Sequence, residues 1–459
     1  MMTKLMLAAA GAALSLSSPS SAQSAQEQLD QRYDRALAAG YKALFLCSAI
    51  ANAERNGATR TPESVMEWEL TGIQTPLDEI VGDLEYRVFR ADNGTSVVTR
   101  VEVDWDDGAP PRLALHQQTG GCSLQSIAQN DTSVPETLPF RDPREHIFIW
   151  HERIAKGGWK TIRTRTFAEN YGAGTRTTAL IIAGKSGPNS RYSYSGNFGP
   201  DTPQRTWSVA KSIAATLVGA AVYRGEADVN ASAGLGADEN DPRRAITIDH
   251  ALRMASGRYT ATPGNRTDAL YYGGATVQES MTHWPLIHAP GTVYRYANND
   301  TLAATQAIRH TFKDHPPAEF FAKIGMNHTV AETDWQGDYI LSSQVWSTAG
   351  DLAKLGQLML NDGVLPNGER VLPEGWVEYV TSATGPQPDG PMGYGAGWWL
   401  INKSEGIPPD TYAALGNRGQ ILVVVPSRNV VIVRRGEDPA GTRFDVVSFT
   451  RDVLAALEE

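Results

Sequence analysis

The most constraining feature of this chain is an almost uncharged apolar run that begins directly after a serine and a lysine. Residues Thr206–Ser212 read Thr-Trp-Ser-Val-Ala-Lys-Ser and lead into Ile213–Val222, where Thr216 is the one polar side chain. The run ends at Arg224 and Gly225, a basic last turn followed by the glycine at which helices commonly stop. This pattern predicts a helix that is buried on nearly every side.

Ser208 and Lys211 stand three residues apart in this helix, so their side chains lie on one face and can touch. A serine hydroxyl becomes a good nucleophile when a base removes its proton, and apolar surroundings lower the pKa of a lysine toward that task. Burying a charge is costly, so such a lysine needs either an ion partner or a chemical role. Ser-x-x-Lys also occurs by chance in long chains, and the assignment therefore depends on the rest of the sequence.

The first 22 residues have the composition of a secretory signal peptide. Lys4 precedes an apolar run, Leu5–Leu16, and the small residues Ser20-Ser21-Ala22 form the expected cleavage site. The run is too short to span a bilayer, and no cysteine directly follows Ala22 to carry a lipid. We therefore expect a periplasmic or secreted protein without a membrane anchor after cleavage.

Composition is that of a folded enzyme-sized globule. The chain has 459 residues, of which 41% are hydrophobic and 20% charged, enough for one large or two modest domains. The net charge of −10 argues against nucleic acid or an anionic membrane as a partner. The nine histidines show no metal-ligand spacing, so we expect neither a metal nor a cofactor.

Cys47 and Cys122 are the two cysteines of the sequence. In an oxidising compartment an isolated pair most simply forms a disulfide, whereas a zinc site would need further ligands that are not nearby. Closing a loop of this length contributes about 4 kcal/mol in the chain-entropy model. We predict that the disulfide braces an N-terminal extension, residues 23–150.

Patterning of the remaining chain predicts strands on either side of a helical middle. Asn298 or Asn299 is placed to cap a helix that begins near Thr301. The expected elements are a helix at 28–56, strands at 85–90 and 97–103, a hairpin at 178–195, strands at 394–400, 420–425 and 430–433, and a helix at 443–459. The fold class is α/β (α+β): an antiparallel sheet flanked by helices, with an inserted all-helical lobe at about 225–378 in a domain of residues 151–459.

Several separated motifs give the chain a resemblance to a known family. They are Trp207–Ser212, the stretch Leu252–Gly257, Pro290-Gly291 leading to Tyr296-Ala297-Asn298, and Gly416–Gln420 before a strand. In this order and spacing they resemble the serine β-lactamase and penicillin-recognising superfamily. The likeness is greatest to its class C-like branch, which includes 6-aminohexanoate-dimer hydrolases, D-peptidases and carboxylesterases, and it covers roughly residues 160–459.

The resemblance implies a role for each matching residue. Ser208 is the acylated nucleophile, Lys211 its proton acceptor, and Tyr296 the phenol that passes a proton to the leaving group. Asn298 is the polar residue on the substrate side. The backbone N–H groups of Ser208 and Gln420 form the oxyanion hole, and losing one such donor costs about 10²–10³ in rate.

Chemistry gives Tyr296 independent support. A tyrosine titrates near pH 10 when free, and a nearby ammonium favours its phenolate, so Lys211 and Tyr296 are expected to share one proton. Without the other motifs, Tyr296 would be read as an aromatic residue that packs near a loop.

The third motif departs from the family pattern. Asn417, Arg418 and Gly419, which we place at the substrate, stand where the family usually has Lys-Thr-Gly or His-x-Gly. The usual cation, which holds a substrate carboxylate, is missing. Arg418 either supplies it one position along or points to solvent from the other face of the strand. The departure favours esters, or amides with uncharged flanks, over β-lactams and D-Ala-D-Ala peptides.

Four tryptophans leave two interpretations open. They either line an acyl pocket or pack in the core: Trp284, Trp346, Trp398 and Trp399.

The resulting prediction is a serine hydrolase that cleaves an ester or amide of a small molecule through an acyl-enzyme. One alternative is a β-lactamase or D-amino-acid peptidase. The other is a non-catalytic penicillin-recognising or cell-wall-binding protein.

Overall fold

The main sheet of the protein has seven antiparallel strands. In the computed structural model, the described residues are 19–91, 96–117, 120–129, 156–184, 191–260, 268–282 and 284–457. Neighbouring strands follow the order β10-β11-β12-β13-β14-β5-β6. Their bounds are β5 Thr177–Gly184, β6 Arg191–Tyr194, β10 Gly393–Tyr394, β11 Trp399–Leu400, β12 Tyr412–Gly416, β13 Gln420–Val425 and β14 Val430–Gly436. The predicted pairing within 178–195, the strands at 420–425 and 430–433 and the fold class are confirmed. The strand expected at 394–400 is instead two short strands, β10 and β11, which pair with each other across a turn where Gly397 has a φ of +80°.

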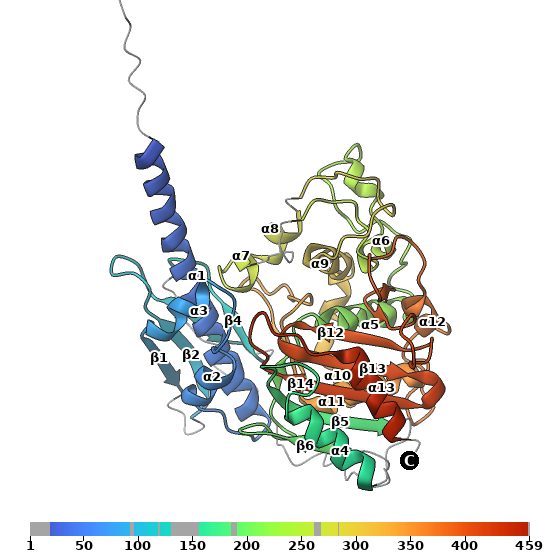
Figure 1. Ribbon diagram of the computed structural model, residues 1–459. Helices are drawn as coiled ribbons and strands as arrows, with labels where there is room; N and C mark the ends of the chain where they lie inside the picture. Colours follow the sequence, from blue (N-terminus) through green and yellow to red (C-terminus); the bar gives the residue numbers. More distant parts are fainter. Residues whose placement is uncertain are drawn as a thin grey trace, which may run out of the picture.

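Apolar residues cover both faces of this sheet, because helices pack on each side (Figure 1). Leu422 and Val424 of β13 belong to the core shared with α5 (Val209–Tyr223) and α11 (Ala349–Leu360). The alternate residues of β13 face the other way, toward α4 (Lys156–Phe167) and α13 (Val446–Ala456). There they share a second apolar core with Phe449 and Val453 of α13. This two-sided burial explains why β13 and β14 read as nearly continuous apolar runs rather than as alternating ones.

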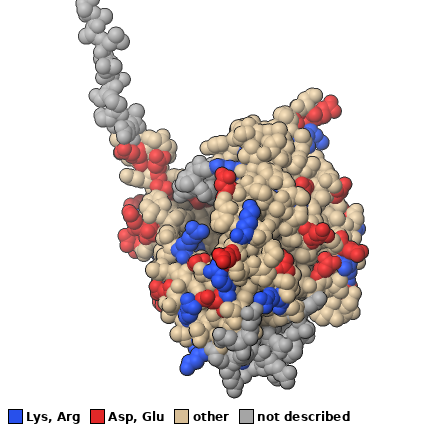
Figure 2. All heavy atoms as spheres, turned by 45° about the vertical axis from the view of Figure 1, so that its right-hand side comes forward, with Lys and Arg blue, Asp and Glu red and all other residues tan. Residues whose placement is uncertain are grey.

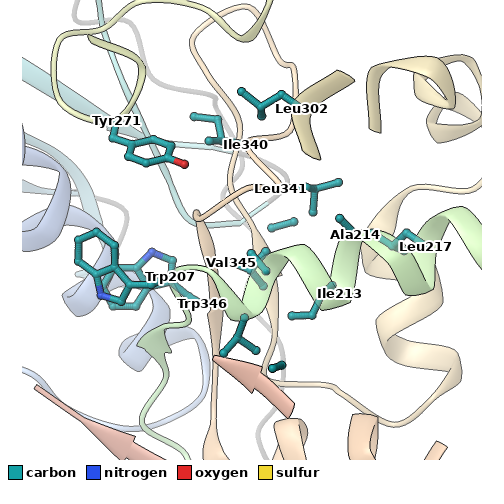
Figure 3. Close-up of a cluster of buried hydrophobic side chains, with 14 of the residues drawn as sticks. Trp207, Ile213, Ala214, Leu217, Tyr271, Leu302, Ile340, Leu341, Val345 and Trp346 are labelled. Atoms are coloured by element: carbon teal, nitrogen blue, oxygen red, sulfur yellow. The ribbon is translucent and has the colours of Figure 1, made fainter. Parts of the chain in front are cut away.

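The predicted serine helix is α5, and it runs through the interior (Figure 3). All its residues from Val209 to Ala221 are buried, and Gly225 just beyond its end has a φ of +75°. Ile213, Ala214 and Leu217 project from it into the apolar cluster of Figure 3. α5 therefore holds its first turn in a fixed position.

The helical lobe stands beside the sheet and carries short helices with long connections (Figure 1). Its helices include α6 Ile248–Leu252, α7 Asp268–Tyr271, α8 Val277–Thr282, α9 Asn298–Ala307, α10 Pro317–Lys323 and α12 Trp376–Thr381. The expectation that residues 225–378 are all helical is wrong. β8 (Val330–Ala331) and β9 (Val345–Ser347) lie within that range. β9 pairs with β8 on one side and, on the other, with β7 (Gln204–Arg205), which leads to the serine.

An N-terminal unit, residues 19–129, packs beside the main sheet. It consists of α1 Pro19–Arg55, α2 Pro62–Trp68, α3 Leu77–Ile80 and an antiparallel sheet in the order β1-β2-β3-β4. The strands are β1 Tyr86–Arg90, β2 Val98–Val103, β3 Arg112–His116 and β4 Cys122–Leu124. The Cys47–Cys122 disulfide joins α1 to β4 as predicted, with the Cα atoms 6.1 Å apart.

The first part of α1 projects from the body, and acidic side chains gather along this exposed beginning (Figures 1 and 2). Within Ser24–Arg55, a window that is apolar enough to cross a membrane is wholly buried, as in the core helix of a folded domain. Most of the predicted signal peptide lies outside the described residues, and its expected end at Ala22 falls within α1.

A buried carboxylate attaches the N-terminal unit to the rest of the protein. Glu332 accepts hydrogen bonds from the Cys122 backbone N–H at 2.9 Å and from the Trp346 indole at 3.0 Å. Burial raises the pKa of Glu332 to about 7. The disulfide and this carboxylate therefore lie at one junction, where β4 meets β8 and β9.

Candidate active site

Ser208 lies at the start of α5, where the chain is held in a strained conformation. The preceding residue, Trp207, has a φ of +50°, which bulky side chains rarely adopt. Its ring is fixed by the Arg205 guanidinium at 4.2 Å and by Phe45 of α1 at 5.9 Å. Surroundings that fix a strained residue in this way are common at functional sites. They leave Ser208 partly exposed while its neighbours on both sides are buried.

Lys211 is the buried amine of the site, with 1% of its surface exposed. Its Nζ lies 3.2 Å from Ser208 Oγ, 2.6 Å from Asn298 Oδ1 and 2.9 Å from the Ser342 carbonyl oxygen. None of these partners carries a charge, so burial dominates and lowers the pKa of Lys211 to about 7. Lys211 therefore exchanges its proton in the neutral pH range.

The three contacts also orient the amine. A neutral lysine has two N–H groups and one lone pair, and Asn298 Oδ1 and the Ser342 carbonyl accept both N–H groups. The third N–H of the ammonium form donates to Ser208 Oγ at 3.2 Å, so the lone pair that replaces it on deprotonation is directed at that oxygen. This arrangement suits a base that removes the proton of Ser208.

Tyr296 precedes α9 and brings its phenol to the same serine. Its side chain forms a hydrogen bond with Ser208, and its ring centroid lies 5.0 Å from Lys211 Nζ. Burial raises the pKa of Tyr296 well above its usual range, and the hydrogen bond to Ser208 opposes this only in part. The expected preference for the phenolate is therefore wrong for the free enzyme: Tyr296 keeps its proton, and Lys211 is the group that loses one.

Asn298 takes a different position from the predicted helix cap. α9 begins at Asn298, its cap residue is Ala297, and no side chain caps this end. The prediction that Asn298 or Asn299 caps the helix is wrong, because the side chains have other partners: Asn298 accepts from Lys211, and Asn299 donates to the Ser280 carbonyl. A direct role of Asn298 in binding substrate stays a prediction.

Two residues of the site were missed by the sequence reasoning. The Ser342 carbonyl accepts from Lys211, and Ser342 Oγ lies 2.7 Å from the Tyr271 hydroxyl. No motif marks either residue, since the contact to Lys211 spans 131 positions of sequence. The one available signal was indirect: a buried lysine requires acceptors from somewhere in the chain.

The turn between β12 and β13, residues 416–420, lies beside the nucleophile. A Cβ built on Gly416 would stand 2.4 Å from the Thr206 carbonyl oxygen and 3.2 Å from Ser208 N, so this position requires glycine. Gln420 pairs with Gly416 across the two strands. The backbone N–H of Gln420 as second oxyanion donor stays a prediction, as do the substrate contacts of Asn417 and Gly419; Asn417 is exposed.

Arg418 does not fit either predicted orientation. It is 5% exposed, its Nε donates to Glu437 at 2.8 Å, and its other nitrogens donate to carbonyl oxygens of the N-terminal unit. A guanidinium used in this way is not available to a substrate carboxylate. The prediction that Arg418 replaces the missing cation is wrong because its φ of +56° turns the side chain away from a regular strand direction.

The four tryptophans divide between core and site. Trp346 and Trp398 are almost fully buried and pack in the core. Trp284 packs on Tyr259, whereas Trp399 stacks on the Tyr296 ring at 5.6 Å. A lining role therefore remains for Trp399.

A groove of about 840 Å³ adjoins the turn 416–420. Trp399, Gly416 and Asn417 form part of its wall, together with the segment between β14 and α13. Two of its wall residues border the site, because Trp399 contacts Tyr296 and Gly416 lies against Ser208, although Ser208 itself does not line the groove. Within the described residues, no group of three His, Cys, Asp or Glu side chains is arranged to hold a metal ion.

Comparison with known proteins gives a consistent result. A family model described as Beta-lactamase matches residues 164–454. A 6-aminohexanoate-dimer hydrolase from Paenarthrobacter ureafaciens is 26% identical over 299 residues, which cover 58% of this chain and 74% of that protein.

Two solved structures share the fold. A putative 6-aminohexanoate-dimer hydrolase from Bacillus anthracis has a TM-score of 0.52 at 20% identity, covering 64% of this chain and 80% of that one. A putative beta-lactamase from Bacteroides dorei DSM 17855 has a TM-score of 0.53 at 17% identity, covering 67% and 100%.

Proposed function

Since this chain belongs to the beta-lactamase family, we propose that it is a serine hydrolase that cleaves a carboxylic ester or amide through a covalent acyl-enzyme on Ser208. One observation carries the proposal: the buried amine of Lys211 lies 3.2 Å from Ser208 Oγ and makes its other two hydrogen bonds to uncharged acceptors, Asn298 Oδ1 and the Ser342 carbonyl. Lys42 is also buried and donates to two backbone carbonyls, so what sets Lys211 apart is the Ser208 hydroxyl within hydrogen-bond reach of its amine.

In the proposed mechanism, Lys211 accepts the Ser208 proton as Oγ attacks the carbonyl carbon of the substrate. The negative charge that develops on the carbonyl oxygen is stabilised by backbone N–H groups, which we assign to Ser208 and Gln420. Tyr296, protonated in the free enzyme, donates its proton to the leaving alcohol or amine and regains one from Lys211. Water then attacks the acyl-enzyme with the same groups in reverse order.

The substrate we propose is an extended, largely apolar ester or amide without a carboxylate at the third motif. Arg418 is occupied, and the adjoining groove has apolar walls that include Met392, Trp399 and Leu415. A relative is named for hydrolysis of a 6-aminohexanoate dimer, in which an amide joins two flexible chains. Such a chain would extend from Ser208 past Trp399 into the groove.

The test is a panel of p-nitrophenyl esters, linear amide oligomers and a chromogenic cephalosporin, assayed with the wild type and with Ser208→Ala. We expect turnover of an ester or linear amide that falls at least 10³-fold in the variant, since loss of the nucleophile removes the covalent route. Rapid cephalosporin turnover without ester turnover would favour a β-lactamase. An absence of turnover and of fluorophosphonate labelling at Ser208 would favour a binding protein.

We further propose that the protein is exported. The signal-like composition of residues 1–22 and the Cys47–Cys122 disulfide support this. Terminal sequencing of the protein recovered from periplasm or medium tests it, and recovery of the uncleaved chain from the cytosol would contradict it.

A further inference from the structure

Arg418 is held by the N-terminal unit in a way that no motif indicated. Its Nη1 donates to the Gly72 carbonyl at 3.0 Å, and its Nη2 donates to the carbonyls of Trp68 and Thr71 at 2.7 and 3.0 Å. We call these three carbonyl groups, which lie at the end of α2 and just after it, the carbonyl clamp. They lie about 350 residues before the arginine that they bind.

The side chain that the clamp holds belongs to the turn beside the nucleophile. Arg418 has a φ of +56°, which a non-glycine residue keeps only when its surroundings fix it. Two backbone groups of the turn are also engaged: the Arg418 carbonyl accepts from Asp438 N at 3.2 Å, and the Gly419 carbonyl accepts from Arg434 at 3.0 Å. The turn is therefore held from its side chain and from its backbone.

Arg435 and Glu437, at the end of β14, connect this turn to β7, the strand that leads into Ser208. Glu437 accepts from Arg418 at 2.8 Å and from the Gln204 amide at 3.0 Å. Arg435 donates to Gln420 Oε1 and, at 2.9 Å, to the Gln204 carbonyl. The turn and the Gln204–Ser208 segment thus share one buried polar network.

From this arrangement we infer that Arg418 is a positioning residue for catalysis, and that the N-terminal unit, through the carbonyl clamp, holds the turn 416–420 in the geometry that stabilises the oxyanion at Ser208. The inference rests on the proposed function of Ser208. It gives the N-terminal unit, which lies outside the family match at residues 164–454, a positioning part in the chemistry.

Contact geometry explains why arginine stands here. Three carbonyl oxygens and one carboxylate surround the side chain, and a guanidinium presents N–H groups in a fixed planar fork that matches such a set. Lysine has the charge but not the fork. Replacing Arg418 therefore releases the turn without touching Lys211, Tyr296 or Asn298.

The experiment compares Arg418→Lys and Arg418→Ala with Arg112→Ala in the full-length protein. Arg112 is a matched control, because it is a buried arginine that donates to the carbonyls of Ala36, Tyr272 and Gln125 but is remote from the turn. We expect kcat to fall 30- to 300-fold in Arg418→Ala, comparable with the loss of one oxyanion donor, and about tenfold in Arg418→Lys. KM of both variants should stay within threefold of the wild-type value, and the pH dependence of kcat/KM near pH 7 should be the same as in the wild type.

Added guanidinium at about 50 mM, well below denaturing concentrations, should restore kcat of Arg418→Ala at least tenfold and leave Arg112→Ala unchanged. A kcat within threefold of wild type in Arg418→Ala would overturn the inference. So would an equal loss in both alanine variants without rescue, which would mark a general loss of stability. If Arg418→Ala does not fold, Arg418→Lys decides by the same criteria of kcat against KM. Turnover retained by Ser208→Ala would instead reject the proposed function itself.

Discussion

Two buried basic residues belong to the surroundings of Ser208, Lys211 in its own helix and Arg418 in the neighbouring turn, and their partners differ in one respect. Lys211 is surrounded by neutral acceptors, whereas Arg418 has a carboxylate, Glu437, among its partners. Without a counter-charge, burial lowers the pKa of Lys211 to about 7, while Arg418 stays charged. The type of side chain, lysine or arginine, and the presence of one carboxylate together separate the group to which we assign proton transfer from the group that holds backbone in place.

The largest expected effect on activity comes from replacing Lys211 by a residue that is as permanently charged as Arg418. Lys211→Arg keeps the cation but cannot deprotonate near neutral pH, so kcat/KM should fall about 10²–10⁴-fold, the range for loss of a general base. Lys42→Arg is the matched control, because Lys42 is buried and donates to the Val81 and Leu84 carbonyls far from Ser208. Wild-type activity in Lys211→Arg would remove the base assignment.

The reverse change gives Arg418 only uncharged partners, as Lys211 has. Glu437→Gln leaves the Arg418 guanidinium buried without its carboxylate, so the free energy of unfolding should fall by about 3 kcal/mol, as for other broken buried ion pairs. Urea denaturation measures this change. The pH dependence of kcat/KM near 7 should stay where it is, because Lys211 keeps all its neighbours. Unchanged stability would show that the pair contributes no more than two neutral groups.

A third variant gives Lys211 the carboxylate that it lacks. In the wild type, kcat/KM should rise with pH through about 7, because only the neutral amine of Lys211 acts as a base. Asn298→Asp places a carboxylate at the 2.6 Å contact, which favours the ammonium and raises the pKa. The rising limb should move up by about one pH unit, a tenfold loss of rate at neutral pH. Asn298→Ala, which adds no charge, should not move the limb upward.

The smallest effect concerns the stability of the lysine site. The folded-state pKa of Lys211, about 7, lies below the unfolded value, so between these pH values the unfolded chain binds a proton that the folded protein lacks. Wild-type stability therefore rises with pH across this window. Lys211→Met should gain about 1 kcal/mol at pH 7, after the lost hydrogen bonds are counted. Because wild-type stability rises by up to about 1.4 kcal/mol per pH unit in this window, the gain should disappear about one pH unit higher and become a loss by pH 10. Differential scanning calorimetry across pH measures it, and a gain that grew with pH would contradict the linkage.

The comparison also shows which features the sequence could predict. α5 with Ser208 and Lys211 was predictable, because helical spacing and apolar patterning are local properties of the chain. The late strands and the disulfide followed from patterning and from cysteine chemistry. Each of these depends on neighbouring residues or on a pair without competitors.

The surroundings of the two cations were not predictable in the same way. Lys211 meets Ser342 across 131 positions and Arg418 meets Trp68 across 350, and no periodicity links such distant residues. For Arg418 the error had a specific source: we read it as part of a strand, whereas its left-handed backbone sends the side chain in another direction. The sequence shows the charge of each residue, but it does not show which distant groups act as its hydrogen-bond or ion-pair partners.

The carbonyl clamp affects the order in which the protein folds during its synthesis. Its two halves are separated by about 350 residues, so a chain that emerges from the ribosome with its N-terminus first has α2 long before Arg418 exists. Contacts of such long range form late and slowly, because a large loop must close before they can contribute. The turn beside Ser208 therefore becomes fully ordered only when almost the entire polypeptide has been synthesised, and we expect a nascent or truncated chain to contain Ser208 without this ordered turn.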